Sequence, residues 1–124
     1  MSTRCQVKIQ GTDVNGSAAF TLYHHCDGYP SYMLPLIASG YKDVWQAARA
    51  GKAASMLCAA DPTGFELEQG HDLHGDIEYY YVVNTTSGGW TVTAYRVGYE
   101  GDMAAICTDM PVAEAAKQAE AIES

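Results

Sequence analysis

Four residues that can bind a proton or a metal ion follow one another near the N-terminus, as His24-His25-Cys26-Asp27. They end a predicted β-strand, and the Gly-Tyr-Pro sequence at 28–30 then predicts a sharp turn into a helix. Successive side chains of a strand point to opposite faces, so the four residues cannot converge on one ion without a break in the strand. In the structural alternative, Asp27 caps the turn or helix and the histidines are partly buried polar groups with ordinary partners.

A second polar cluster, His-Asp-Leu-His-Gly-Asp at 71–76, contains the other two histidines. With Cys26 or His24, these histidines could form a mixed metal site. Cys26 with His71 or His74 could instead form a Cys–His nucleophile pair. The chain has no C-x-x-C pair, no H-E-x-x-H helix motif and no G-x-S-x-G elbow, so we predict no metal site, no cofactor and no catalytic residue. The alternative is a small-molecule or metal-binding domain with hydrolytic activity, which would use His24, His25, Asp27, His71 and His74.

Aromatic residues are the third group, and they concentrate in the predicted second hairpin. Tyr79, Tyr80, Tyr81, Trp90, Tyr95 and Tyr99 place rings on both of its faces, so we expect some rings to stay exposed. Tyrosine and tryptophan are common at protein interfaces, although cross-strand packing under the helices explains the same residues equally well. The predicted binding residues are His24, His25, Asp27, Tyr29, Tyr79, Tyr81, Trp90 and Tyr95.

The elements that position these groups begin with a hairpin. Alternating apolar and polar residues predict a strand over 3–9, and residues 18–26 predict its partner. The turn formers at 11–16 predict a connection longer than a tight turn. An apolar stripe at helical spacing then predicts a helix over 31–50, with Gly40 as the point where it would split in two. Pro35 is tolerable if it lies in the first turn, and it would kink a helix that began earlier.

The second half alternates short predicted strands with polar loops. An Ala-rich helix over 52–60 ends at Asp-Pro-Thr-Gly, and a short strand follows it. The remaining predicted elements are a polar loop at 69–75, strands at 76–84 and 90–97 joined by the Gly-containing loop 85–89, and a weakly amphipathic helix over 111–123.

The length of 124 residues fits one domain, 1–124, and the pattern of elements predicts an α+β fold. We expect a mostly antiparallel sheet with two hairpins, helices packed on one face and a C-terminal helix. No stretch has the length of a membrane span or the pattern of a signal peptide, and the four scattered cysteines indicate reduced thiols, so the expected location is cytoplasmic. The same lack of a long apolar stretch predicts no membrane partner. The formal net charge of −8, with seven dispersed basic residues, argues against direct nucleic-acid binding and is compatible with a basic partner surface.

The segment Tyr23-His24-His25-Cys26-Asp27-Gly28-Tyr29-Pro30 resembles a family of small phage and prophage proteins with the hallmark Y-x-H-W-D-G-Y-P. The similarity also takes in the opening strand, the helix after the motif and, more loosely, the strand pair around 79–95, which is about half of the chain. It implies an origin in a mobile element and supplies no catalytic residues. Cys26 stands where the hallmark has Trp, and Pro35 interrupts the start of the helix.

Together these observations predict a phage or prophage accessory protein that acts by binding a host or phage protein. Inhibition of a host defence system is the role we expect for it. A homo-oligomer with a structural role is the third hypothesis, because an exposed aromatic strand can pair with its copy.

Overall fold

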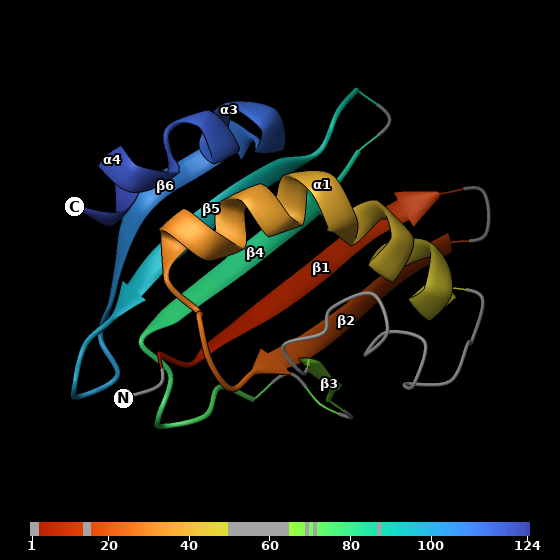
Figure 1. Ribbon diagram of the computed structural model, residues 1–124. Helices are drawn as coiled ribbons and strands as arrows, with labels where there is room; N and C mark the ends of the chain where they lie inside the picture. Colours follow the sequence, from red (N-terminus) through yellow and green to blue (C-terminus); the bar gives the residue numbers. More distant parts are fainter. Residues whose placement is uncertain (1–2, 14–15, 50–64, 69, 71, 87) are drawn as a thin grey trace.

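The structure is a computed structural model that describes residues 3–13, 16–49, 65–68, 70, 72–86 and 88–124. It confirms the α+β fold with a mostly antiparallel sheet and a helical C-terminus (Figure 1). The sheet has six strands in the order β3-β2-β1-β4-β5-β6, and β1 and β4 pair in parallel at its centre. The elements in chain order are β1 (Cys5–Asp13), β2 (Gly16–His24), α1 (Pro30–Arg49), β3 (Phe65–Leu67), β4 (Tyr79–Thr85), β5 (Thr91–Val97), β6 (Met103–Pro111), α3 (Val112–Lys117) and α4 (Ala119–Glu123).

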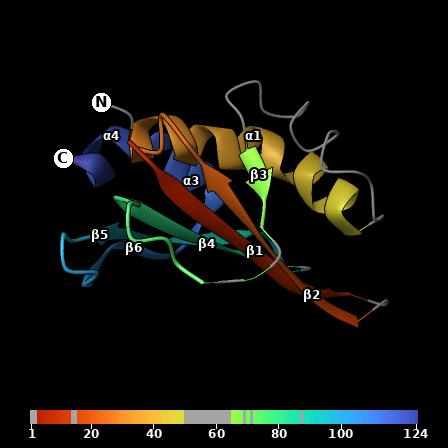
Figure 2. The ribbon, with the colours of Figure 1, turned by 90° about the horizontal axis from the view of Figure 1, so that it is seen from below.

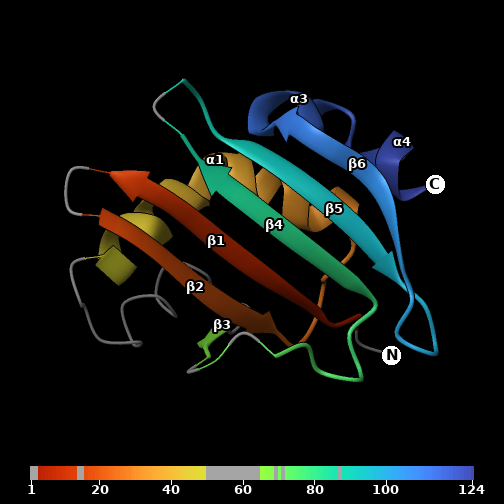
Figure 3. The ribbon, with the colours of Figure 1, turned by 180° about the vertical axis from the view of Figure 1, so that it is seen from behind.

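All three described helices lie on the same side of the sheet. Figure 2 shows α1, α3 and α4 in one layer with the strands in the other, and Figure 3 shows the opposite face of the sheet without a helix in front of it. The C-terminal helices α3 and α4 both pack beside α1. None of the helices in the described part of the chain is long and apolar enough to cross a membrane. We call the opposite face, which no described helix covers, the helix-free face.

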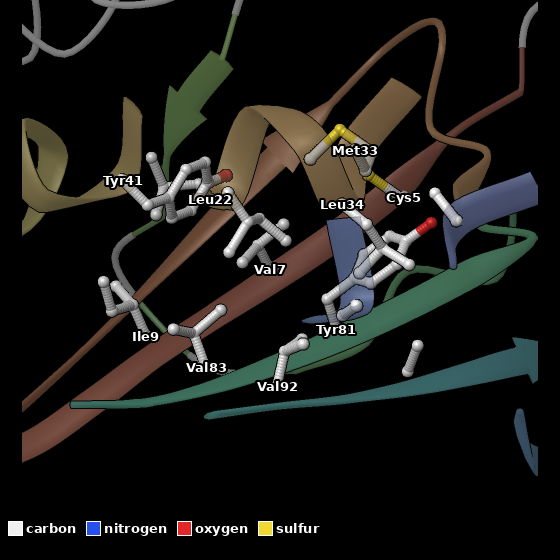
Figure 4. Packing of buried hydrophobic residues seen from close by; sticks show 14 of the residues in the cluster. Cys5, Val7, Ile9, Leu22, Met33, Leu34, Tyr41, Tyr81, Val83 and Val92 are labelled. Carbon is white, nitrogen blue, oxygen red and sulfur yellow. The ribbon is translucent and has the colours of Figure 1, made fainter. Parts of the chain in front are cut away.

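The hydrophobic core lies between α1 and the sheet (Figure 4). Strand alternation places Cys5, Val7 and Ile9 of β1 on the helix side, and all three are fully buried. The stripe of α1 that meets them includes Met33 and Ile37, four residues apart on the same helix surface. The predicted half-buried strand and the predicted apolar stripe are therefore both confirmed.

Helix α1 begins at Pro30, where the carbonyl of Tyr29 accepts hydrogen bonds from the backbone N–H groups of the next turn. It continues without a break through Gly40, so the predicted split is wrong; burial of the apolar stripe on both sides of Gly40 stabilises one continuous helix. Pro35 is the sixth residue of α1, beyond the first turn in which a proline ring is tolerated without loss of an intrahelical hydrogen bond. Its side chain is exposed, so the ring adds no conflict with the core.

Three further expectations need correction. The first hairpin has a short connection, because its ladder continues to the pair Asp13 and Gly16. Strand β6 was not predicted at all, since its mostly exposed, alanine-rich sequence lacks a clear apolar alternation. The closing helix is divided at Gln118 into α3 and α4. The helix predicted over 52–60 lies outside the described residues.

Candidate functional site

The helix-free face carries a row of aligned side chains that crosses the sheet. The strand register places Tyr23, Gln6, Tyr80, Tyr95 and Ala105 opposite one another on β2, β1, β4, β5 and β6. The rings of Tyr80 and Tyr95 stack with their centroids 6.0 Å apart and their planes at 25°. Partial burial, followed by the neighbouring Tyr95, raises the pKa of the Tyr80 phenol above its ordinary value. The Tyr80 hydroxyl therefore stays neutral at physiological pH.

The aromatic pair continues into an apolar surface toward the β6 edge. Val97 and Met103 are paired across β5 and β6, and they share the face of Tyr95 by strand alternation. Met103 is one of the large apolar side chains that the described residues leave open to solvent, with 45% of its surface exposed. We call this set the tyrosine patch: Tyr80, Tyr95, Val97, Met103 and Ala105.

Acidic residues border the patch at one end. Asp76 and Glu78 precede β4, and Glu100 and Asp102 lie in the turn between β5 and β6; all four side chains are exposed. The two segments are neighbours, because residues 75–78 and 97–99 line one shallow concavity of about 420 Å³. We call these four carboxylates the acidic rim. A surface with an aromatic centre and an anionic border is complementary to an apolar surface bordered by Lys or Arg.

Hydrogen bonds hold the loop that leads into β4 over the other end of the row of aligned side chains, at Gln6 and Tyr23. The Gln6 side chain is fully buried; its Nε2 donates to the Asp72 carbonyl at 3.0 Å, and its Oε1 accepts from the His74 N–H at 2.8 Å. The Tyr23 hydroxyl donates to Asp76 Oδ2 at 2.8 Å. His74 Nε2 lies 2.5 Å from Glu68 Oε1. These contacts explain why Gln6 and Tyr23 are buried although no described helix covers them.

The Asp-Gly-Tyr-Pro corner is held from several sides. Gly28 donates its N–H to the Thr3 carbonyl at 2.9 Å and accepts from the Tyr81 hydroxyl at 2.7 Å. A Cβ at Gly28 would lie 2.8 Å from the Cβ of Cys5, which explains why a glycine stands there. Asp27 has a φ of 58°, and its carboxylate accepts from the Tyr29 hydroxyl at 3.2 Å, which raises the pKa of Tyr29. These contacts give the corner a structural role.

The structure separates the predicted binding residues. His24 and Tyr81 are fully buried on the helix side, where the His24 ring stacks on Tyr32, so neither side chain can contact a partner at the surface. Tyr79 is half-buried on the same side, and so is Trp90, which packs against the core. His25 is exposed, whereas Asp27 and Tyr29 belong to the corner. Of the predicted residues, Tyr95 alone lies in the tyrosine patch.

Sequence reasoning did not select Tyr80, Val97, Met103 and Ala105. One available signal was Asn84, which shares the alternation of Tyr80 and Val82 and so marks that side of β4 as the polar one. Met103 and Ala105 could not be placed without knowing that β6 is a strand.

The histidines do not form a metal centre among the described residues, where no group of three or more His, Cys, Asp or Glu side chains is arranged to hold an ion. His24 and His25 point to opposite sides, as the strand alternation predicts, and His74 pairs with Glu68. His71 lies outside the described residues. No disulfide joins Cys5, Cys26 and Cys107; burial raises the pKa of the Cys107 thiol, although a hydrogen bond from the Ala94 backbone opposes that shift.

A second hollow, of about 490 Å³, lies at the far end of β1, β2 and β4. Its lining side chains are small or neutral, and Gln10 Nε2 donates to Asn84 Oδ1 at 2.8 Å across it. Because no described lining residue is titratable, the hollow offers no group for acid–base or nucleophilic chemistry.

Comparisons with protein-family models, with curated proteins and with solved structures find no match for this chain. The candidate surface therefore has to be judged by its own geometry. That geometry is a helix-free sheet face with a partly exposed aromatic and apolar centre and an acidic border.

Proposed function

We propose that this protein binds another protein through its tyrosine patch, as a phage or prophage accessory protein that inhibits a host defence system. The observation that carries the proposal is the tyrosine patch itself: two stacked tyrosines, with Val97 and an exposed Met103, on a sheet face that no described helix covers. Contiguous exposed apolar surface with aromatic residues is typical of protein-contact sites.

The chemistry of the patch favours contact over catalysis. Its members are phenols and apolar side chains, and the pKa of Tyr80 is moved further from neutrality, so the patch supplies no acid or base near pH 7. Tyrosine adds a large contact area with few rotatable bonds and keeps a hydroxyl for hydrogen bonding.

The acidic rim supports a partner whose own surface is basic. A net charge of −8 attracts such a partner at long range. At the border, Glu78, Glu100 and Asp102 would meet its Lys or Arg side chains, whereas Asp76 already pairs with Arg4 of this chain at 3.5 Å. The phage origin and the anti-defence role draw their support from the resemblance of the Tyr23–Pro30 segment to the Y-x-H-W-D-G-Y-P motif.

The test is quantitative capture from a bacterial lysate with three forms of the chain. These are the wild type, a Tyr80→Ala/Tyr95→Ala variant, and a Lys42→Ala/Gln46→Ala control with substitutions on the exposed side of α1. We expect the wild type and the control to retain the same protein, and the tyrosine variant to retain at least about tenfold less of it, because interface aromatics often dominate binding energy. Equal recovery by all three forms would contradict the proposal.

The inhibitor role has its own readout. Bacteria that carry a defence system should be plated with a sensitive phage while they express each of the three forms. We expect the wild type and the control to raise the plating efficiency, and the tyrosine variant to leave it at the level of an empty vector. If no form raises plating in any defence background, the inhibitor role is withdrawn, and the binding role is judged from the capture experiment alone.

A further inference from the structure

Among the strands that the structure describes, β6 ends the sheet and has a neighbour on one side only. The Val97 N–H donates to the Glu78 carbonyl, toward β4, whereas the next N–H, that of Gly98, donates to the Asp102 carbonyl, toward β6. In an antiparallel ladder these directions alternate along each strand. The backbone groups of Met103, which pairs with Val97, and of Ala105 therefore point away from β5, to the free edge.

Only the first half of this edge is regular. The register with β5 shifts between Val92 and Tyr95, and Asp109 has a φ of 45° with its N–H bonded to the Thr93 hydroxyl at 3.0 Å. Pro111 has no N–H to offer. Bulges and prolines of this kind protect an edge from pairing, so the second half of β6 is blocked. One of the two register shifts falls between Ala105 and Cys107, so the stretch that carries neither device is Met103–Ala105.

The regular half also lacks the side chains that would shield it. Ala104 and Ala105 are small and exposed, so an extended backbone can approach closely. Met103 and Ala105 belong to the tyrosine patch, which therefore reaches the edge itself. A strand added beside 103–105 would continue the sheet and place alternate side chains next to Tyr95 and Met103.

The charges decide between the two occupants of such an edge. A second copy of this chain would bring its own net charge of −8 and its own Glu100 and Asp102 to the contact, and like charges oppose pairing. A segment rich in Lys or Arg meets the same carboxylates with the opposite sign.

We propose that the Met103–Ala105 edge of β6 binds an extended, basic segment of the partner protein by strand addition. The inference rests on the proposed function and makes it specific: the main chain of the partner pairs with β6, and its apolar or aromatic side chains cover the tyrosine patch. Met103 and Ala105 supply the backbone donors and acceptors, and the acidic rim selects for basic residues.

The test is selection of binders from a random peptide library, with peptides of about twelve residues, against the full chain. We expect enriched peptides to alternate Lys or Arg with Val, Ile or Tyr. In amide hydrogen exchange, the Met103 and Ala105 amides should exchange quickly in the free protein and slow down at least about tenfold with a selected peptide. The Ala104 amide, which faces β5, should be protected in both states.

Two substitutions isolate the edge. Ala105→Pro removes an outward N–H without breaking a hydrogen bond to β5. Ala104→Lys adds a repelling charge to the same edge, from an exposed residue whose side chain lies on the opposite side of the sheet from the tyrosine patch. Thr108→Lys, which places the same charge in the blocked half, is the matched control. We expect either edge variant to weaken peptide binding at least about tenfold, and the control to change it by less than about twofold. Because the lysine variant leaves the outward N–H groups and the tyrosine patch in place, it tests the edge if the proline variant fails to fold.

The outcomes separate edge from face. Enrichment of acidic peptides, no enrichment, or binding insensitive to both Ala105→Pro and Ala104→Lys would overturn strand addition. Peptides that lose affinity with Tyr80→Ala/Tyr95→Ala but not with these two edge variants would leave the proposed function standing and remove the edge from it; the converse would keep the edge and remove the face. A wild-type dimer by light scattering that Ala105→Pro abolishes would assign the edge to a second copy and overturn the hetero-partner proposal.

Discussion

At the scale of single residues, the Asp-Gly-Tyr-Pro corner shows how polar groups with chemical potential are used for structure. The Tyr81 hydroxyl is buried and donates to the Gly28 carbonyl, so it joins the centre of β4 to the corner before α1. Asp27 and Tyr29 hold each other at the same turn. The sequence of the histidine-bearing motif suggests a reactive cluster. In the structure, the contacts of the motif position the backbone instead.

The hydrogen bond of the Tyr81 hydroxyl should make a measurable contribution to the free energy of unfolding. Tyr81→Phe leaves the Gly28 carbonyl without this donor, so we expect it to lower the free energy of unfolding by about 1–2 kcal/mol at neutral pH. Burial, the largest cause, raises the pKa of Tyr81 well above that of an unfolded tyrosine. The corresponding stability is therefore complete below about pH 10 and is lost as the pH rises above it.

Urea unfolding at neutral pH and at about pH 11 checks both parts of this prediction. The wild type should lose more stability between the two pH values than Tyr81→Phe does. Tyr99→Phe, at a fully exposed tyrosine, is the control and should match the wild type at neutral pH. An unchanged midpoint for Tyr81→Phe at neutral pH would show that the hydrogen bond contributes nothing.

At the scale of elements, the C-terminal helices lock the start of α1. Glu123 Oε1 accepts from both the backbone N–H and the hydroxyl of Ser31, at 2.9 and 2.8 Å, in the first turn of α1. A carboxylate there satisfies an open N–H and interacts favourably with the helix dipole. On the other side, Arg96 donates to the Glu123 carbonyl at 2.7 Å and ties α4 to β5.

Removing this carboxylate should loosen the helix layer. We expect Glu123→Ala to lower the free energy of unfolding by about 1 kcal/mol, because the first turn of α1 loses its cap. Glu120→Ala, an exposed glutamate on the same helix, should change it by less than about 0.5 kcal/mol. Thermal unfolding followed by circular dichroism compares the two, and equal effects would contradict the capping role.

Sequence patterns predicted the elements whose periodicity is strong and missed those defined by tertiary context. Strand β1, helix α1 and the β4–β5 hairpin follow from alternation, an apolar stripe and a glycine-containing loop. Strand β6 escaped because an exposed edge strand needs little apolar alternation. The candidate site could not be predicted for the same reason, because the face of Tyr80 and the edge at Ala105 are defined only once β4, β5 and β6 are aligned.

At the scale of the whole molecule, the sheet has two unequal sides. The described helices cover one side, as Figures 2 and 3 show. The other side carries the tyrosine patch with its acidic rim. Because the net charge of −8 acts over the whole surface, the rate at which the proposed basic partner associates should depend on salt more than the rate at which it leaves.

We expect the association rate constant for the captured partner to fall at least about tenfold between about 0.05 and 0.5 M NaCl, as screening shortens the range of attraction. The dissociation rate constant should change by less than about threefold, since short-range contacts at the patch set it. Surface plasmon resonance measures both. An association rate that is flat across this range would remove charge complementarity from the argument for a basic partner.

The parallel pairing of β1 with β4 carries a consequence for how the chain reaches this state. The two strands at the middle of the sheet belong to opposite halves of the sequence. The elements β1, β2 and α1 therefore leave the ribosome before β4, which completes the sheet beneath α1, has been synthesised. Until β4 is synthesised, the apolar side of α1 can pack against β1 and β2 but not against the other half of the sheet. Closing the long loop between β1 and β4 is slow. Newly made chains should therefore depend on holdase chaperones in proportion to how slowly their second half is translated.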